Sequence, residues 1–249
     1  MPFYYKKVLV ISDNIGQCLL LRDIFIEKGI TGEVETGWAC SPYSNSGMFS
    51  EKSGLAFSSV DLKNPAEVKK IINGWPLVIS MHCKQLFPAE LVKAVKCINV
   101  HPGYNPVNRG WYPQVFAIIN NSIIGATIHE IDEQLDHGAI IDRMEVPKYE
   151  TDTSLDLYNR VLAAEAELLR KNIIPVLKNV YTSFAPEAEG KLYLKKDFKG
   201  LCQLDLKEQN TLQFFITKLR ALTHGNFNNA YYYDADGKKI FVKIKLEAE

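Results

Sequence analysis

The chain has 249 residues, of which 47% are hydrophobic, and its 29 basic and 29 acidic residues give a formal net charge of zero. This length and apolar content predict one sizeable α/β domain with an appendage, or two small domains, and exclude a mainly disordered chain. The neutral charge argues against a protein that binds nucleic acid along its backbone, because such proteins present a basic face.

The cysteines and the apolar runs indicate the compartment. The five cysteines are scattered and form no C-x-x-C pair, a pattern typical of reduced thiols and not of a disulfide framework. The N-terminus shows no signal-peptide pattern, and no apolar run approaches the roughly 20 residues that span a bilayer. We therefore expect a soluble, cytoplasmic protein with no membrane partner.

The first part of the chain alternates strands and helices. Lys7–Ser12 is apolar on both faces, as in the centre of a parallel sheet. A helix follows and ends near Gly29, whereas residues 30–53, rich in Gly, Ser and Tyr, predict a loop that could move over a site. The next predicted elements are a helix from Asn64-Pro65 to Gly74, a strand over 76–80, a helix near 88–95 and a strand over 96–100. This alternation predicts right-handed crossovers and a Rossmann-like, mostly parallel sheet.

The second part adds strands, a long helix and a tail. A helix over 114–119 precedes strands over 123–131 and 139–146, and a long helix opens at Thr153 and runs towards Val180. Pro175 is expected to break or kink this helix. The composition changes after residue 185, where a strand over 192–194, a helix over 210–222 and a β-hairpin around Asp236-Gly237 are predicted. We predict an N-terminal domain over 1–185 and a C-terminal appendage over 186–249, whose hairpin must dock on another surface because a lone hairpin is barely stable.

Two polar side chains leave the carboxyl end of the strand over 96–100. Asn99 and His101 are two residues apart and therefore share one face of the strand. Ligands bind at this end of parallel strands. An amide beside an imidazole offers a donor for an oxyanion and a group that carries a proton near neutral pH. Taken alone, the pair fits equally an Asn that closes a turn and a His bonded to backbone.

Further motifs follow in order. Arg109-Gly110 and Pro113 lie in a polar, proline-rich stretch, Gly125–His129 reads Gly-x-Thr-x-His, and Asp136-His137-Gly138 forms a turn before an apolar run. Together with Asn-x-His-Pro, this set resembles the folate-dependent formyltransferases, which include glycinamide ribonucleotide, methionyl-tRNA and nucleotide-sugar N-formyltransferases. The resemblance extends over residues 76–146 and implies a catalytic trio of Asn99, His101 and Asp136.

The resemblance also implies that N10-formyltetrahydrofolate is the co-substrate. In this family the folate lies against the segment after the third parallel strand and against the turn before the catalytic Asp, largely through backbone contacts. The corresponding residues are Met81, His82, Cys83, Lys84, Leu86, Phe87, Ile131 and Leu135. Phe87 also fits a core position under the following helix. No metal is expected, because His82, Cys83 and His101 lack a fourth ligand at metal-like spacing.

The sequence outside these motifs narrows the choice of formyl acceptor. The glycinamide ribonucleotide enzymes carry a Gly-Ser-Gly-type phosphate loop, whereas this chain has Ser12–Gly16, in which Asp13 would repel a phosphate. The tRNA enzymes carry a longer C-terminal barrel and a basic surface, whereas this chain has a short tail and no net charge. The stretch Tyr104–Pro113 looks most like that of the dTDP-4-amino-4,6-dideoxyhexose N-formyltransferases. Those enzymes serve surface polysaccharides such as the O-antigen of lipopolysaccharide and dimerise through a short hairpin, so we expect a homodimer through the C-terminal hairpin.

Four residues are expected to bind the nucleotide sugar: Asn14, Tyr104, Arg109 and Trp111. Arg109 could contact the acceptor or its pyrophosphate as a charge-assisted donor, or brace the proline-rich loop. Trp111 could stack on sugar or base, or serve in packing. The other acceptors remain alternatives, as do a deformylase that hydrolyses formyl-folate and a non-catalytic folate- or nucleotide-binding module.

Overall fold

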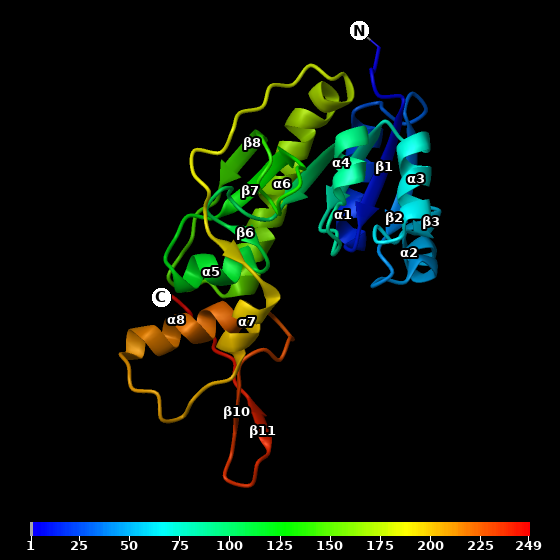
Figure 1. Cartoon of the computed structure of the whole chain (residues 1–249). Coiled ribbons are helices and arrows are strands. Elements are labelled where there is room, and N and C mark those ends of the chain that lie inside the picture. Colours follow the sequence, from blue (N-terminus) through cyan, green and yellow to red (C-terminus); the bar gives the residue numbers. More distant parts are fainter. Residues whose placement is uncertain (1) are drawn as a thin grey trace. The chain divides into compact units, whose positions relative to one another are not determined.

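The computed structural model describes residues 2–249 (Figure 1). The chain divides into two compact units. Unit 1 comprises the chain up to His101, Thr127–Arg143 and Glu165–Glu187; unit 2 comprises Pro102–Ala126, Met144–Ala164 and Ala188–Glu249. The division predicted after residue 185 stays a prediction. Within residues 2–249, no helix combines the length and the apolar character needed to cross a membrane.

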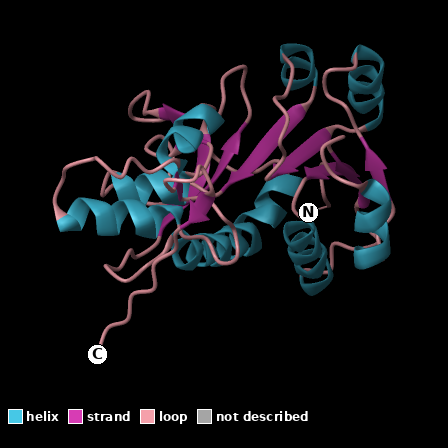
Figure 2. Ribbon diagram, turned by 90° about the horizontal axis from the view of Figure 1, so that it is seen from below, coloured by secondary structure: helices cyan, strands magenta, loops and turns pink. Residues whose placement is uncertain are grey.

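A seven-stranded sheet carries the fold, with its strands drawn in magenta in Figure 2. Its strands, in spatial order, are β3 (Phe57–Ser59), β2 (Glu35–Cys40), β1 (Lys7–Ser12), β4 (Leu77–Met81), β5 (Lys96–His101), β7 (Gly125–Glu130) and β8 (Ile140–Glu145). The pairs from β3 through β5 are parallel, and β5 pairs antiparallel with β7. The strand order reverses between β1 and β4. The Rossmann-like, mostly parallel sheet is therefore confirmed.

The helices begin at residues that the sequence marks. The helices that precede residue 178 are α1 (Ile15–Glu27), α2 (Ser46–Ser53), α3 (Pro65–Gly74), α4 (Ala89–Ala94), α5 (Pro113–Ile119) and α6 (Ser154–Leu177). The Asn64 side chain caps α3 and Pro65 occupies its first turn, as predicted. Of the two expected effects of Pro175, a break of α6 is wrong, because the helix continues to Leu177, whereas a kink stays a prediction. Pro175 lies in the last turn, where the loss of one backbone N–H removes a single hydrogen bond.

The loop predicted over 30–53 is wrong, because the segment contains β2 and α2. In β2 only the last three residues are buried, and Gly37 shows no strand preference of its own. A side chain at Gly37 would place its Cβ 2.5 Å from the Trp75 ring, so tight packing against that ring requires glycine. The strand is thus specified by its two neighbours in the sheet and not by its own pattern.

One hydrophobic cluster of unit 1 lies beneath α3 and α4. Its buried members include Leu9 and Val78 from the sheet and Ile71 and Leu91 from the helices. Three residues of the predicted folate site, Cys83, Phe87 and Ile131, pack partly buried against this cluster. Phe87 therefore occupies the core position that the sequence left as an alternative.

Unit 2 contains smaller elements that follow residue 101. They are β6 (Arg109–Gly110), β9 (Leu192–Tyr193), α7 (Lys195–Cys202), α8 (Leu212–Leu222), β10 (Tyr231–Tyr233) and β11 (Lys239–Phe241). The strands β6 and β9 pair in parallel, and α5 packs against α8. The predicted hairpin is confirmed, and Gly237 takes a left-handed φ of 77° in its turn. The hairpin joins the residue after α7 through a bridge between Gln203 and Tyr231, whereas α7 and β6 were not predicted.

Candidate active site

The end of β5 and the turn before β8 bring Asn99, His101 and Asp136 together, as the sequence led us to expect. Asn99 Nδ2 donates a hydrogen bond to Asp136 Oδ1 at 3.1 Å, and His101 Nδ1 lies 3.5 Å from Asp136 Oδ2. His101 and Asp136 are 4% and 8% exposed, while Asn99 is half-buried. The cluster thus places a carboxylate between an amide and an imidazole in a largely water-excluded position. Its catalytic role stays a prediction.

The local fold presents the Asp136 carboxylate. Asp136 has a left-handed φ of 48°, which non-glycine residues rarely adopt. Gly138 allows the turn to close on β7, because a Cβ there would lie 1.9 Å from the Glu130 carbonyl oxygen. Asp132 ties the turn together by accepting the Gln134 N–H at 2.8 Å and by contacting His137 Nδ1 at 2.7 Å. The turn is therefore fixed by its own hydrogen bonds and by one glycine.

His129 is a fourth member of the cluster that sequence reasoning did not select. It lies on β7 directly opposite Asn99 in the antiparallel register. Its Nδ1 is 2.7 Å from the Glu130 carbonyl oxygen, which only accepts hydrogen bonds, so Nδ1 carries the proton. Its Nε2 then accepts a hydrogen bond from Asn99 Nδ2 at 3.1 Å. His129 belongs to the Gly-x-Thr-x-His motif, but only the strand register reveals its contact with Asn99.

These contacts occupy the Asn99 amide. Its Nδ2 lies 3.1 Å from both His129 Nε2 and Asp136 Oδ1, which are themselves 3.5 Å apart. Donation from this amide to a substrate oxygen therefore competes with donation to these two acceptors. The same network fixes the orientation of the amide before any substrate binds.

The predicted folate segment follows β4 in unit 1. Met81 is fully buried, whereas Leu86 is 71% exposed. His82 Nε2 contacts both carboxylate oxygens of Glu165 in α6, and the Lys84 N–H donates to Asp13 Oδ2 at 2.7 Å. The segment also forms one wall of a groove of about 520 Å³, whose other walls include Tyr43, Leu62 and Lys63. The second part of the predicted folate site, Ile131 and Leu135, is half-buried in the turn before β8.

The chemistry of Cys83 bears on metal binding. Burial raises the pKa of its thiol to about 12, so it does not present the thiolate that metals prefer. Within residues 2–249, no three His, Cys, Asp or Glu side chains group so that they could hold a metal ion.

The turn after β1 contains Asp13, whose carboxylate accepts hydrogen bonds from two other segments. Asp13 Oδ1 accepts hydrogen bonds from the Ser41 N–H, the Ser41 hydroxyl and the Ser44 hydroxyl at 3.1, 2.6 and 2.7 Å. Its carboxylate thus joins the loop after β2 to the segment after β4. Asn14, a predicted substrate residue, caps α1 by accepting the Gly16 and Gln17 N–H groups. The observed contacts of Asn14 are therefore those of a helix cap.

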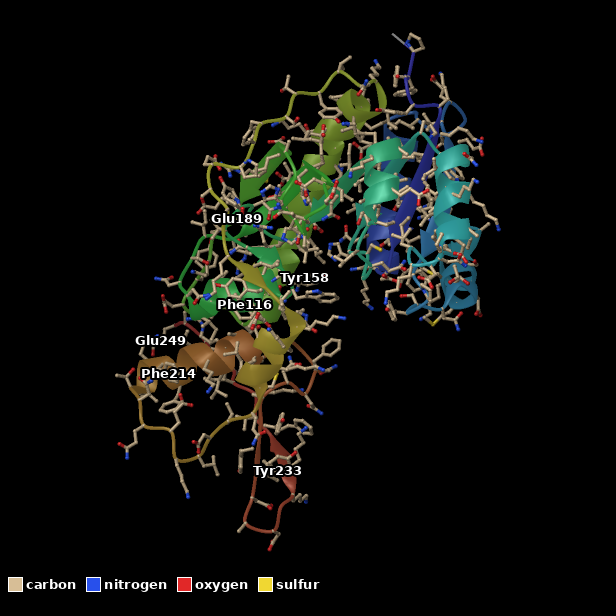
Figure 3. All side chains as sticks on the ribbon, in the orientation of Figure 1. Phe116, Tyr158, Glu189, Phe214, Tyr233 and Glu249 are labelled. Carbon is tan, nitrogen blue, oxygen red and sulfur yellow. The ribbon has the colours of Figure 1, made fainter. Side chains whose placement is uncertain are left out.

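The remaining predicted substrate residues belong to unit 2. Arg109 is 3% exposed, and its Nη1 donates to the carbonyl oxygen and to Oε1 of Glu189, at 2.5 and 2.6 Å (Figure 3 labels Glu189). This pair braces the proline-rich loop, which is the second of the two roles that the sequence suggested for Arg109. The Trp111 ring lies 3.8 Å from Lys195 Nζ, and the Tyr104 N–H donates to the Asn108 side chain. Roles of these residues towards a substrate stay predictions.

Comparisons with known proteins agree with this geometry. Residues 39–173 match the formyl transferase family, and residues 197–248 match the N-formyltransferase dimerization C-terminal domain. The chain is 50% identical, over 182 residues, to a dTDP-4-amino-4,6-dideoxyglucose formyltransferase of Mycobacterium tuberculosis; the match covers 73% of this chain and 78% of that protein.

Two solved structures resemble the whole chain. A sugar N-formyltransferase from a Shewanella species has a TM-score of 0.92 at 39% identity, with 98% of each chain covered. A 4-N formyltransferase from Francisella tularensis has a TM-score of 0.89 at 40% identity, with 98% of this chain and 99% of that chain covered. Because the family match spans more than half of the residues and the mycobacterial relative is similar over most of both chains, this chain belongs to the formyl transferase family.

Proposed function

We propose that the protein transfers the formyl group of N10-formyltetrahydrofolate to the amino group of a nucleotide-linked amino sugar, a dTDP-4-amino-4,6-dideoxyhexose, for surface polysaccharide biosynthesis. The observation that carries this proposal is the cluster of the half-buried Asn99 with the buried His101 and Asp136 at the carboxyl end of β5. The mycobacterial relative, whose name specifies a dTDP-4-amino sugar, supports the choice of acceptor.

The cluster supplies what formyl transfer needs. The acceptor nitrogen forms a bond to the formyl carbon, the bond from that carbon to N10 breaks, one proton leaves the amine and one arrives at N10. Negative charge gathers on the formyl oxygen, where a protonated His101 and the Asn99 amide act as donors. Asp136 accepts the proton of the amine, directly or through water, and orients His101, which lies 3.5 Å away.

The contacts of Asn99 couple proton removal from the amine to charge stabilisation at the formyl oxygen. While Asp136 is a carboxylate, it accepts one of the Asn99 Nδ2 hydrogens. A proton taken up by Asp136 weakens it as an acceptor, because a neutral carboxyl binds a donor less strongly than a carboxylate does. One amide hydrogen then becomes available to the formyl oxygen, while the hydrogen bond to His129 holds the amide in place. Proton removal from the amine thereby favours charge stabilisation at the oxygen.

The folate is assigned to the segment after β4 and to the turn before β8. The segment after β4 leaves the carboxyl end of a strand at the reversal of strand order between β1 and β4, where ligands of such sheets bind. The turn before β8 carries Asp136 to the Asn99 side chain of β5. The exposed Leu86 and the half-buried Leu135 offer apolar contacts at the two parts of this site. The backbone of residues 81–84 offers polar ones.

We also propose a homodimer through the C-terminal hairpin. The match of residues 197–248 to a dimerization domain supports it, as do the exposed rings of Tyr233 and Phe241 on β10 and β11. Phe241→Lys should shift the protein to a monomer in sedimentation velocity, while a matched change at the far tip, Lys238→Glu, should leave the dimer intact. A monomeric wild-type protein at micromolar concentration would refute this assembly.

A mass-spectrometric acceptor screen tests the function. Purified protein is incubated with N10-formyltetrahydrofolate and with dTDP-, UDP- and GDP-linked amino sugars, and each sugar is followed for the gain of one formyl group. We expect the gain on a dTDP-4-amino-4,6-dideoxyhexose. Formylation of a different sugar would correct the acceptor, and formate release without an acceptor would indicate a deformylase. Binding of a nucleotide without any turnover would indicate a non-catalytic module.

A further inference from the structure

Two carboxylates from different elements hold the segment that follows β4. His82 Nε2 lies 3.0 and 2.9 Å from the two carboxylate oxygens of Glu165, which projects from α6. Two residues later the Lys84 N–H donates to Asp13 at the end of β1. All of these residues belong to unit 1. The segment is thus attached to the sheet on one side and to a long helix on the other.

Glu165 is unusual among the charged residues of α6, because its side chain is 0% exposed. A buried carboxylate is unfavourable unless a partner donates to it, and His82, itself only 12% exposed at its side chain, is that partner. His82 in turn has a left-handed φ of 55°, a conformation that is unfavourable for a residue with a Cβ. The hydrogen bond to Glu165 therefore compensates for an unfavourable backbone at this position.

A third attachment follows directly. The Gln85 side chain donates to the Val60 carbonyl oxygen at 2.8 Å and accepts the Leu62 N–H at 2.9 Å. Glu165, Asp13 and the backbone of residues 60–62 thus hold residues 82, 84 and 85 by hydrogen bonds. The next residue, Leu86, is exposed. A backbone fixed in this way loses little conformational entropy when a ligand binds to it.

We propose that Glu165 is a positioning residue for folate: it acts through His82 to hold the backbone of residues 81–84 in its binding conformation. This inference rests on the proposed function, which assigns folate to that segment. Glu165 affects the affinity for folate and not the chemical step, because it acts on this segment through His82 and not on Asn99, His101 or Asp136. The nucleotide sugar should bind independently of it.

The test compares Glu165→Gln with Glu167→Gln, the same chemical change at an exposed position of the same helix. Tetrahydrofolate binding is measured by isothermal titration calorimetry, and kcat and the KM of each substrate are measured in the formyl-transfer assay. For Glu165→Gln we expect the Kd of tetrahydrofolate and the KM of formyl-folate to rise roughly tenfold, since a charge-assisted hydrogen bond becomes neutral. The KM of the sugar and kcat should change less than about twofold, and Glu167→Gln should behave as wild type.

His82→Asn provides a second variant, because Asn tolerates the left-handed backbone but is too short to reach Glu165. It should weaken folate binding in the same way, and it decides the question should Glu165→Gln fail to fold. Wild-type folate affinity in the folded variants, or a loss of kcat with unchanged folate KM, would overturn the role of Glu165. A wild-type protein that binds no tetrahydrofolate would instead refute the proposed function.

Discussion

Replacing Asp136 by Asn tests the proton-accepting role of the cluster while preserving its shape. The substitution keeps the left-handed backbone, which Asn tolerates, but removes the carboxylate that accepts from Asn99 at 3.1 Å and lies 3.5 Å from His101. Loss of a general base lowers rates by about 10²- to 10⁴-fold, which corresponds to roughly 3–5 kcal/mol of activation free energy. We expect kcat to fall within this range, with both KM values and Tm close to wild type.

The assay is steady-state formyl transfer at saturating folate and sugar, with Tm from differential scanning fluorimetry. Asp132→Asn is the matched control, since it makes the same change in the same turn at a partly exposed contact with His137, while the Asn side-chain oxygen can still accept the Gln134 N–H that helps to close the turn. The contact with His137 contributes at most about 1 kcal/mol to holding the turn, so kcat of the control should fall by less than about fivefold. A folded Asp136→Asn variant that loses no more activity than Asp132→Asn would refute the reasoning.

Three further predictions concern other parts of the chain. His129→Phe removes the acceptor that orients Asn99, so kcat should fall by about ten- to a hundredfold, and unchanged kinetics would contradict the role of His129. Gly138→Ala places a Cβ 1.9 Å from the Glu130 carbonyl oxygen, so unfolding in urea should show a loss of about 1–3 kcal/mol together with lower kcat. Burial lowers the pKa of His224, so the unfolded chain binds the proton first, and stability falls as pH drops below about 6.5. Urea unfolding at two pH values should show a smaller loss for His224→Phe, and an equal loss would exclude this histidine as the cause.

The sequence predicts those strands and helices that are determined by neighbouring residues. The run over Lys7–Ser12 is apolar on both faces and forms a central strand, and Asn64-Pro65 starts a helix because a cap and a proline act within one turn. Asn99 and His101 could be paired from the two-residue period of a strand. Asp136 required the family motif, because nothing in the local pattern shows that its turn returns to β5.

The features that the sequence did not predict depend on contacts between residues far apart in the chain. β2 is specified by β1, β3 and the Trp75 ring, and therefore has little pattern of its own. The contact of His129 with Asn99 follows from an antiparallel register, which periodicity does not fix. Glu165 has the sequence context of a surface residue on a helix, and only its contact with His82 reveals that it is buried.

The C-terminal tail is one of three chain segments that build unit 2, and another of these segments begins directly after His101. Residues 188–249 fold with 102–126 and 144–164, and Pro102 is bonded directly to His101. Within unit 2, α8 covers α5, and Arg220 donates to the Asp152 carbonyl oxygen at 2.9 Å. A chain cut after residue 187 would leave the buried apolar side of α5 without its cover. The tail is therefore part of the packing of unit 2, together with the loop that follows β5, and does not form a compact unit of its own.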